Sequence, residues 1–248
     1  MNRETANVLL LLVGGALVKI AVDGSYVRYV KPGLLPYLLA AALLIIVLGI
    51  AAIARDVRRG QAPDADDDSD GHRHGTRPYW MLLVPAAVIL FVAPPALGAS
   101  SVGSSTAQQT MGAPEKTAFP PLPDGPAPEV PLLEVIGRAA RDSTGSLEHR
   151  RITTAGFVLA TGHGGSARVD GGRDGLDLAR VLIICCAADA RTIRVHLDGN
   201  LGDIPEGTWL SVTGVVQTGS ATAGTGYTPT LTVTHASRIP APVNTYAY

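Results

Sequence analysis

Two adjacent cysteines, Cys185 and Cys186, are the residues of this sequence best suited to chemistry. The chain has 2 cysteines in 248 residues, so it contains neither a disulfide framework nor the four-ligand spacing of a structural zinc site. Neighbouring side chains of a strand point to opposite faces, so both thiols can reach one ion only where the strand breaks. A disulfide between them is strained, because adjacent Cα atoms lie closer than ordinary bridges prefer. The AADA segment that follows is able to supply a turn.

Three interpretations of the cysteine pair stay open. The pair can be a thiolate site for a soft metal or metalloid ion, a redox-active vicinal disulfide, or two small side chains packed at the end of a core strand. Asp189 and His196 are the nearest polar residues that could complete a site, although spacing alone ties neither to the thiols. We take Cys185, Cys186 and Asp189 as candidate metal ligands, with a soft metal ion as the cofactor that such a set indicates.

A second group of candidate ligands lies in the segment DADDDSDGHRHG, residues 64–75. Its carboxylates and imidazoles could hold a divalent cation, and His72 and His74 are close enough in sequence to share one. The alternative is a solvated linker with incidental metal affinity. We favour the linker, because Gly, Ser and Asp at this density do not preorganise a site.

The sequence shows no Ser/His/Asp elbow, paired-carboxylate motif, phosphate loop or CxxC motif. We therefore assign no catalytic residue and do not expect an enzyme. Residues 115–248 hold 13 Asp and Glu against 11 Lys and Arg, counted along the sequence. A slightly acidic domain lacks the basic groove that nucleic acid requires, so we expect no nucleic-acid partner.

Three hydrophobic runs, at residues 6–22, 33–54 and 79–99, predict three transmembrane helices. The first could instead be a signal peptide, but no small-x-small cleavage site follows it and the second run comes soon after. The second run carries no charge and is the strongest of the three signals. The third begins with a Tyr-Trp pair and contains three prolines, which predicts a kinked span, with an interfacial hairpin as the alternative.

The charged loops predict the orientation of these helices. Five arginines lie between the second and third runs, whereas the loop after the first has only Arg28 and Lys31. Because positive loops stay in the cytoplasm, we expect the N-terminus and the loop at residues 55–78 inside, and the chain after about residue 100 outside the cell membrane.

The rest of the sequence predicts a tether and a β domain. Residues 101–130 are rich in Ser, Gly and Pro and form the tether between a membrane region at 1–100 and a domain at 131–248. One short amphipathic helix begins that domain. Five strands follow, at residues 151–160, 176–186, 192–198, 208–218 and 228–239. Gly156 and Gly214 lie inside two of these strands and allow sharp bending, so we predict an all-β, OB-like five-stranded barrel.

Several segments together resemble one known family. The run ICCAADA (184–190), the run GTWLSVTGVV (207–216), the Pro-rich aromatic C-terminus and YVKPGLLPYLLAAALL in the membrane region are similar to the YcgQ-type family of permease subunits. The resemblance spans nearly the whole chain. It implies pairing with a larger polytopic permease that supplies the transport path. Family members often carry a longer His-rich loop than the one containing His72 and His74 here.

The leading hypothesis is therefore an accessory subunit in the lipid bilayer, whose external domain assembles with, gates or senses for a permease. One alternative is a membrane-anchored thiol redox or soft-metal-binding protein that uses Cys185 and Cys186. Another is a structural envelope protein. Few polar groups lie in the apolar runs, since the second and third contain no charged residue and the first has only Lys19. This favours an accessory role over solute transport by the chain itself.

Overall fold

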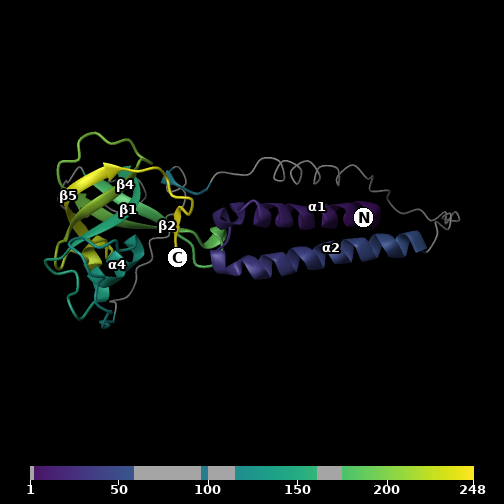
Figure 1. The fold of residues 1–248 in the computed structure, drawn as a ribbon, viewed down its shortest axis with the longest axis horizontal. Helices are drawn as coiled ribbons and strands as arrows, with labels where there is room; N and C mark the ends of the chain where they lie inside the picture. The colour runs from purple at the N-terminus through teal and green to yellow at the C-terminus, as the bar shows by residue number, and fades with distance from the viewer. Residues whose placement is uncertain (1–2, 59–95, 100–114, 161–174) are drawn as a thin grey trace. The chain divides into compact units, whose positions relative to one another are not determined.

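The structure is a computed structural model, and it describes residues 3–58, 96–99, 115–160 and 175–248. The chain separates into two compact units, Met1–Pro95 and Ala96–Tyr248. The first is helical in its described part and the second is built on a β-sheet (Figure 1). The predicted third membrane helix and the loop with His72 and His74 lie outside the described residues, apart from the last few residues of the predicted helix.

The described part of the first unit contains two long helices, α1 (Arg3–Val22) and α2 (Leu35–Arg58). Two short 3-10 turns, Ser25–Arg28 and Pro32–Leu34, connect them. By length and composition one described helix, Pro32–Arg55, can cross a membrane, and the apolar part of α1, Ala6–Val22, is shorter. These helices correspond to the first two predicted spans.

Small residues let α1 and α2 pack closely. A Cβ added to Gly14 would lie 2.6 Å from Ile46, and one added to Gly49 would lie 3.1 Å from Leu11. Gly14 follows Leu11 in α1, whereas its partner Ile46 precedes Gly49 in α2. The two helices are therefore antiparallel and form a hairpin. The packing matches the general role of small residues between membrane helices. Gly15, next to Gly14, has open space where its Cβ would be.

Six strands form the sheet of the second unit. They are β1 (Arg151–Ala160), β2 (Leu176–Leu182), β3 (Arg191–Asp198), β4 (Trp209–Val216), β5 (Thr230–Arg238) and β6 (Tyr246–Ala247). The strand order is β1-β4-β5-β3-β2-β6, and β1 also pairs with β2. The first five strands therefore make a closed circuit of pairings. All five predicted strands are present, and β6 is an addition.

The circuit depends on a change of partner within β1. Residues Arg151–Phe157 pair with β4, whereas Phe157–Ala160 pair with β2. Gly156 lies at this change, and a Cβ there would be 2.5 Å from the Ala179 carbonyl oxygen. Gly214 lies in β4 beside a register shift against β5, and a Cβ added there would collide with the Thr232 carbonyl oxygen. Both glycines permit the close backbone approach that a curved sheet needs.

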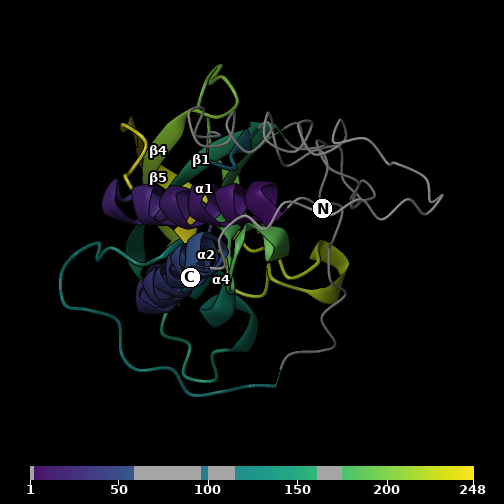
Figure 2. The ribbon, with the colours of Figure 1, turned by 90° about the vertical axis from the view of Figure 1, so that its right-hand side faces the viewer.

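The main core lies between the sheet and α4 (Leu132–Arg141), the predicted short helix. Leu132 and Val135 of α4 are fully buried against strand residues that alternate inward, such as Val195 and Leu197 of β3. This alternation is the pattern expected of a strand with one buried face. Figures 1 and 2 show α4 on one side of the curved strands.

A second core involves both ends of the unit. Phe157 and Tyr246 are buried there, and Ala96, Leu97 and Ala99 pack on the same cluster. The Leu97 backbone N–H donates to the Tyr246 hydroxyl at 2.8 Å. Residues 96–99 thus belong to the β unit.

The described part of the predicted tether, residues 115–130, also lies along this unit. The Val130 N–H donates to the Thr153 carbonyl at 2.8 Å, and the Thr117 N–H donates to the Arg141 carbonyl at 2.9 Å. Arg138 of α4 is 3% exposed and donates to the Pro120 carbonyl and to Glu134. A buried guanidinium needs such partners, so these contacts hold the segment to the helix.

Candidate functional site

The cysteine pair lies in a tight turn just after β2. The strand ends at Leu182, four residues earlier than predicted, and a 3-10 turn follows at Ala187–Asp189. Cys185 and Cys186 therefore lie outside the sheet. The strand breaks before the pair, which is the condition for both thiols to reach one ion, and the AADA segment forms the turn.

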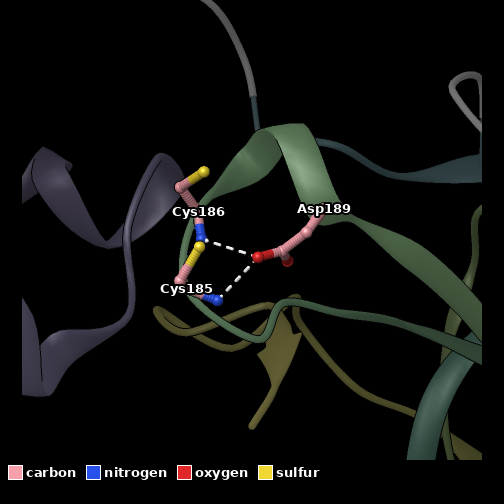
Figure 3. A group of neighbouring side chains, drawn as sticks. All are labelled: Cys185, Cys186 and Asp189. Carbon is pink, nitrogen blue, oxygen red and sulfur yellow. Dashed lines mark hydrogen bonds between the residues drawn. The ribbon is translucent and has the colours of Figure 1, made fainter.

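The Asp189 carboxylate organises this turn by accepting three backbone hydrogen bonds. Its Oδ1 accepts from the Ile184 N–H at 2.8 Å, and its Oδ2 accepts from the N–H groups of Cys185 at 2.8 Å and Cys186 at 3.2 Å. Figure 3 shows the carboxylate facing the backbone nitrogens of the two cysteines. A carboxylate at the third position after the N-cap commonly binds back in this way.

The turn brings three potential ligand atoms together. The two sulfur atoms and a carboxylate oxygen of Asp189 all lie within 4.8 Å of one another. Both cysteines are free thiols, with Cys185 exposed and Cys186 half-buried. The interpretation that they pack at the end of a core strand is therefore wrong for Cys185. It failed because β2 stops before the pair and the turn lifts Cys185 into solvent.

The thiol and the carboxylate change each other's protonation. A hydrogen bond to Asp189, followed by one to Cys186, raises the pKa of Cys185 to about 11. The same thiol hydrogen bond, with the backbone N–H donors, lowers the pKa of Asp189 below its ordinary value. At neutral pH the pair therefore holds a proton on Cys185 and a negative charge on Asp189.

His196 does not join the cysteines. It lies on β3 opposite Asp177 of β2, and its Nδ1 is 3.1 Å from the Asp177 Oδ1. Both side chains are mostly buried. Asp177 carries no signal of this pairing in the sequence, because a cross-strand partner is determined by the register of the paired strands.

A separate cleft of about 500 Å³ lies between β5 and the loop from β3 to β4. Its lining includes Asp203, His235 and Arg238. None of the candidate ligands at the cysteine turn contributes to it. Sequence patterns did not indicate this cleft, since its walls come from segments separated along the chain.

These features define a chain with an apolar helix of membrane-spanning length and a six-stranded β domain that presents an exposed thiol turn. Residues 139–248 match the family described as the DUF1980 C-terminal domain, which is consistent with the YcgQ-type resemblance. The matched segment includes all six strands and the Cys185, Cys186 and Asp189 turn. No curated protein and no solved structure matches the chain.

Proposed function

We propose that this chain is an accessory subunit of a membrane permease. Its N-terminal helices dock on the permease within the lipid bilayer, and its β domain assembles with, gates or senses for the transporter on the outer side. The transport path belongs to the larger polytopic partner. The proposal also includes three membrane spans, a cytoplasmic N-terminus and an OB-like barrel. The closed circuit of strand pairings supports the barrel, and the arginine-rich loop supports the orientation.

The uncovered apolar surface of α2 carries this proposal. Only 11% of the residues in its apolar stretch are buried. Leu43 and Leu44 are 63% and 60% exposed, although α1 packs against α2. Such a surface requires lipid or other helices around it. The apolar stretch from Gly33 to Ala54 contains no charged side chain that could form a solute path, which favours docking over transport.

Site-specific photocrosslinking tests the docking. A diazirine side chain at Leu43 or Leu44 should give an adduct with a polytopic permease in native membranes. The same probe at Ile46, which faces Gly14 of α1, is the matched control and should give little adduct. Adducts with lipid alone from both exposed positions would reject the proposal.

A reporter active only in the cytoplasm, fused after Tyr248, should stay silent if the C-terminus is outside.

A thiol redox role is a second candidate, because Cys185 is an exposed free thiol next to a second one. The raised pKa of Cys185 argues against it, since the thiolate is the reactive species in exchange. The test is the reduction potential of the pair in the purified chain. A disulfide that forms reversibly at a glutathione potential would favour this role over the accessory one.

A further inference from the structure

We propose that Cys185, Cys186 and Asp189 form a transfer site for a thiophilic divalent cation of the zinc class. The binding step stands on the turn itself. The identity of the recipient, the permease, and the arrival of the cation from the medium rest on the proposed function. The cation would arrive from the medium, bind the turn and pass to a ligand supplied by the partner.

The types of ligand atom define the class of cation. Two cysteine sulfurs and one carboxylate oxygen lie within 4.8 Å of one another, a span that an ion between them can bridge after small side-chain rotations. Sulfur donors select zinc-class and copper-class ions, whereas magnesium and calcium prefer oxygen ligands alone. A vicinal pair in a continuous strand could not converge in this way, but the break after Leu182 removes that obstacle.

The hydrogen bonds of Asp189 leave room for the ion. A carboxylate has about four lone-pair positions, and three backbone N–H groups use three of them. The Cys185 thiol also donates to this carboxylate, and its proton leaves when the cation binds, so the fourth position becomes free at that step. The backbone bonds therefore hold the carboxylate in place while one oxygen stays able to coordinate.

The binding step balances as an exchange of protons for the cation. The divalent ion forms two metal–sulfur bonds, and the two S–H bonds break and release two protons to water. No oxidant or reductant takes part. Two thiolates and one carboxylate then surround the ion with three negative charges, so the filled site carries a net charge of one negative.

Exposure distinguishes a transfer site from a structural one. Structural zinc sites are closed by four protein ligands, whereas this turn offers three and leaves one position open. Cys185 is exposed, and the neighbouring Ile184 side chain is 58% exposed. An apolar side chain beside an open coordination position suits the approach of a protein that contributes the fourth ligand.

Cadmium binding to the full chain tests the site. The chain is purified in mild detergent, reduced, stripped of metal with a chelator and titrated with Cd²⁺, while the ultraviolet thiolate-to-cadmium absorption is recorded. We expect an equimolar endpoint, and competition by Zn²⁺ but not by Mg²⁺. The double variant C185S/C186S should lose the absorption, and D189N should weaken binding about tenfold or more.

Two control variants separate this turn from other carboxylates and imidazoles. H72A/H74A removes the imidazoles of the cytoplasmic loop and should bind Cd²⁺ as the unaltered chain does. D142N is the matched control for D189N, because Asp142 also accepts backbone N–H groups in a turn, those of Thr144 and Ser146. It should leave the absorption unchanged.

Each outcome decides the proposal. A chain without thiolate-to-cadmium absorption, or a C185S/C186S variant that binds Cd²⁺ like the unaltered chain, overturns the site. If a chain without this absorption still crosslinks to a permease, the metal site is overturned and the proposed function stands. Equimolar binding by a chain that never crosslinks to a permease supports the site and defeats the accessory role.

Discussion

The Asp189 side chain shows how one carboxylate can organise a reactive turn. It accepts from the backbone of three consecutive residues and from the Cys185 thiol. The thiol hydrogen bond raises the pKa of Cys185 to about 11, so an exposed cysteine is kept protonated at neutral pH. Such a group is a poor nucleophile but remains available to a metal ion that displaces its proton.

The pKa of Cys185 predicts its rate of alkylation. Since its pKa is raised from 9.0 to about 11, its thiolate fraction at pH 8 should be on the order of a hundredfold below that of an ordinary thiol. In the reduced, metal-free chain, iodoacetamide should therefore modify Cys185 slowly at pH 8 and faster as the pH rises towards 11. Rates measured by mass spectrometry across this range test the prediction.

Replacement of Asp189 supplies the control. D189N removes the carboxylate whose hydrogen bond with the thiol is the first cause of the shift, so the pKa of Cys185 should fall and alkylation at pH 8 should accelerate. Equal rates with and without the carboxylate would show that Asp189 does not hold the proton on the thiol.

Curvature of the sheet depends on two glycines within strands. β1 changes partner from β4 to β2 at Phe157, and Gly156 allows the Ala179 carbonyl to approach closely. A side chain at that position would force the two backbones apart. Through this change of partner, β1 pairs with β4 at one end of the series β4-β5-β3-β2 and with β2 at the other end. β1 therefore closes the circuit of five strands.

Substitution of Gly156 by alanine should destabilise the β unit by about 1–3 kcal/mol, the usual cost of overpacking. The added Cβ would meet a backbone oxygen at 2.5 Å, which cannot rotate away. Gly224→Ala is the control, because the nearest atom there is 3.7 Å away, and its effect should stay within about 0.5 kcal/mol. Urea unfolding monitored by Trp209 fluorescence compares the two variants, and equal midpoints would count against the assigned role of Gly156.

The helix hairpin offers a similar comparison between adjacent residues. Gly14→Leu should loosen the α1–α2 contact, since even its Cβ would lie 2.6 Å from Ile46. Gly15→Leu adds the same side chain where nothing lies within 4 Å and should leave the hairpin intact. Limited proteolysis in detergent micelles should cut the first variant faster. Equal resistance of the two variants would contradict the packing found for Gly14.

The β unit extends beyond its strands, because segments before α4 complete its packing. Residues 115–130 hydrogen bond to α4 and β1, and Val130 is 3% exposed. Arg138 donates to both the Pro120 carbonyl and the Ser146 hydroxyl at 2.8 Å. Loss of the segment would leave this buried guanidinium short of partners.

Truncation tests how far the unit reaches. A chain of residues 96–248 expressed alone should be soluble, with a β-dominated circular dichroism spectrum. A chain that starts at Pro131 should lose several kcal/mol of its free energy of unfolding, at about 1 kcal/mol for each lost buried hydrogen bond. Denaturant unfolding of the two chains gives the difference. Equal stability would mean that residues 96–130 contribute nothing to the fold.

Local patterns were sufficient to locate most elements of this protein. The apolar runs predicted α1 and α2, alternation predicted β3, and clusters of β-branched residues predicted β1, because each signal depends on neighbours in the sequence. The two-residue strand β6 was missed, since it is too short for any periodicity and exists only by pairing with β2.

The candidate site divides in the same way. Residue type and closeness in the sequence were enough to nominate Cys185, Cys186 and Asp189, although spacing alone did not tie Asp189 to the thiols. Their convergence, the exposure of Cys185 and the pairing of His196 with Asp177 required the folded chain. Contacts between residues distant in sequence determine where β2 ends and how it pairs in register with β3. These contacts form only when the sheet is assembled.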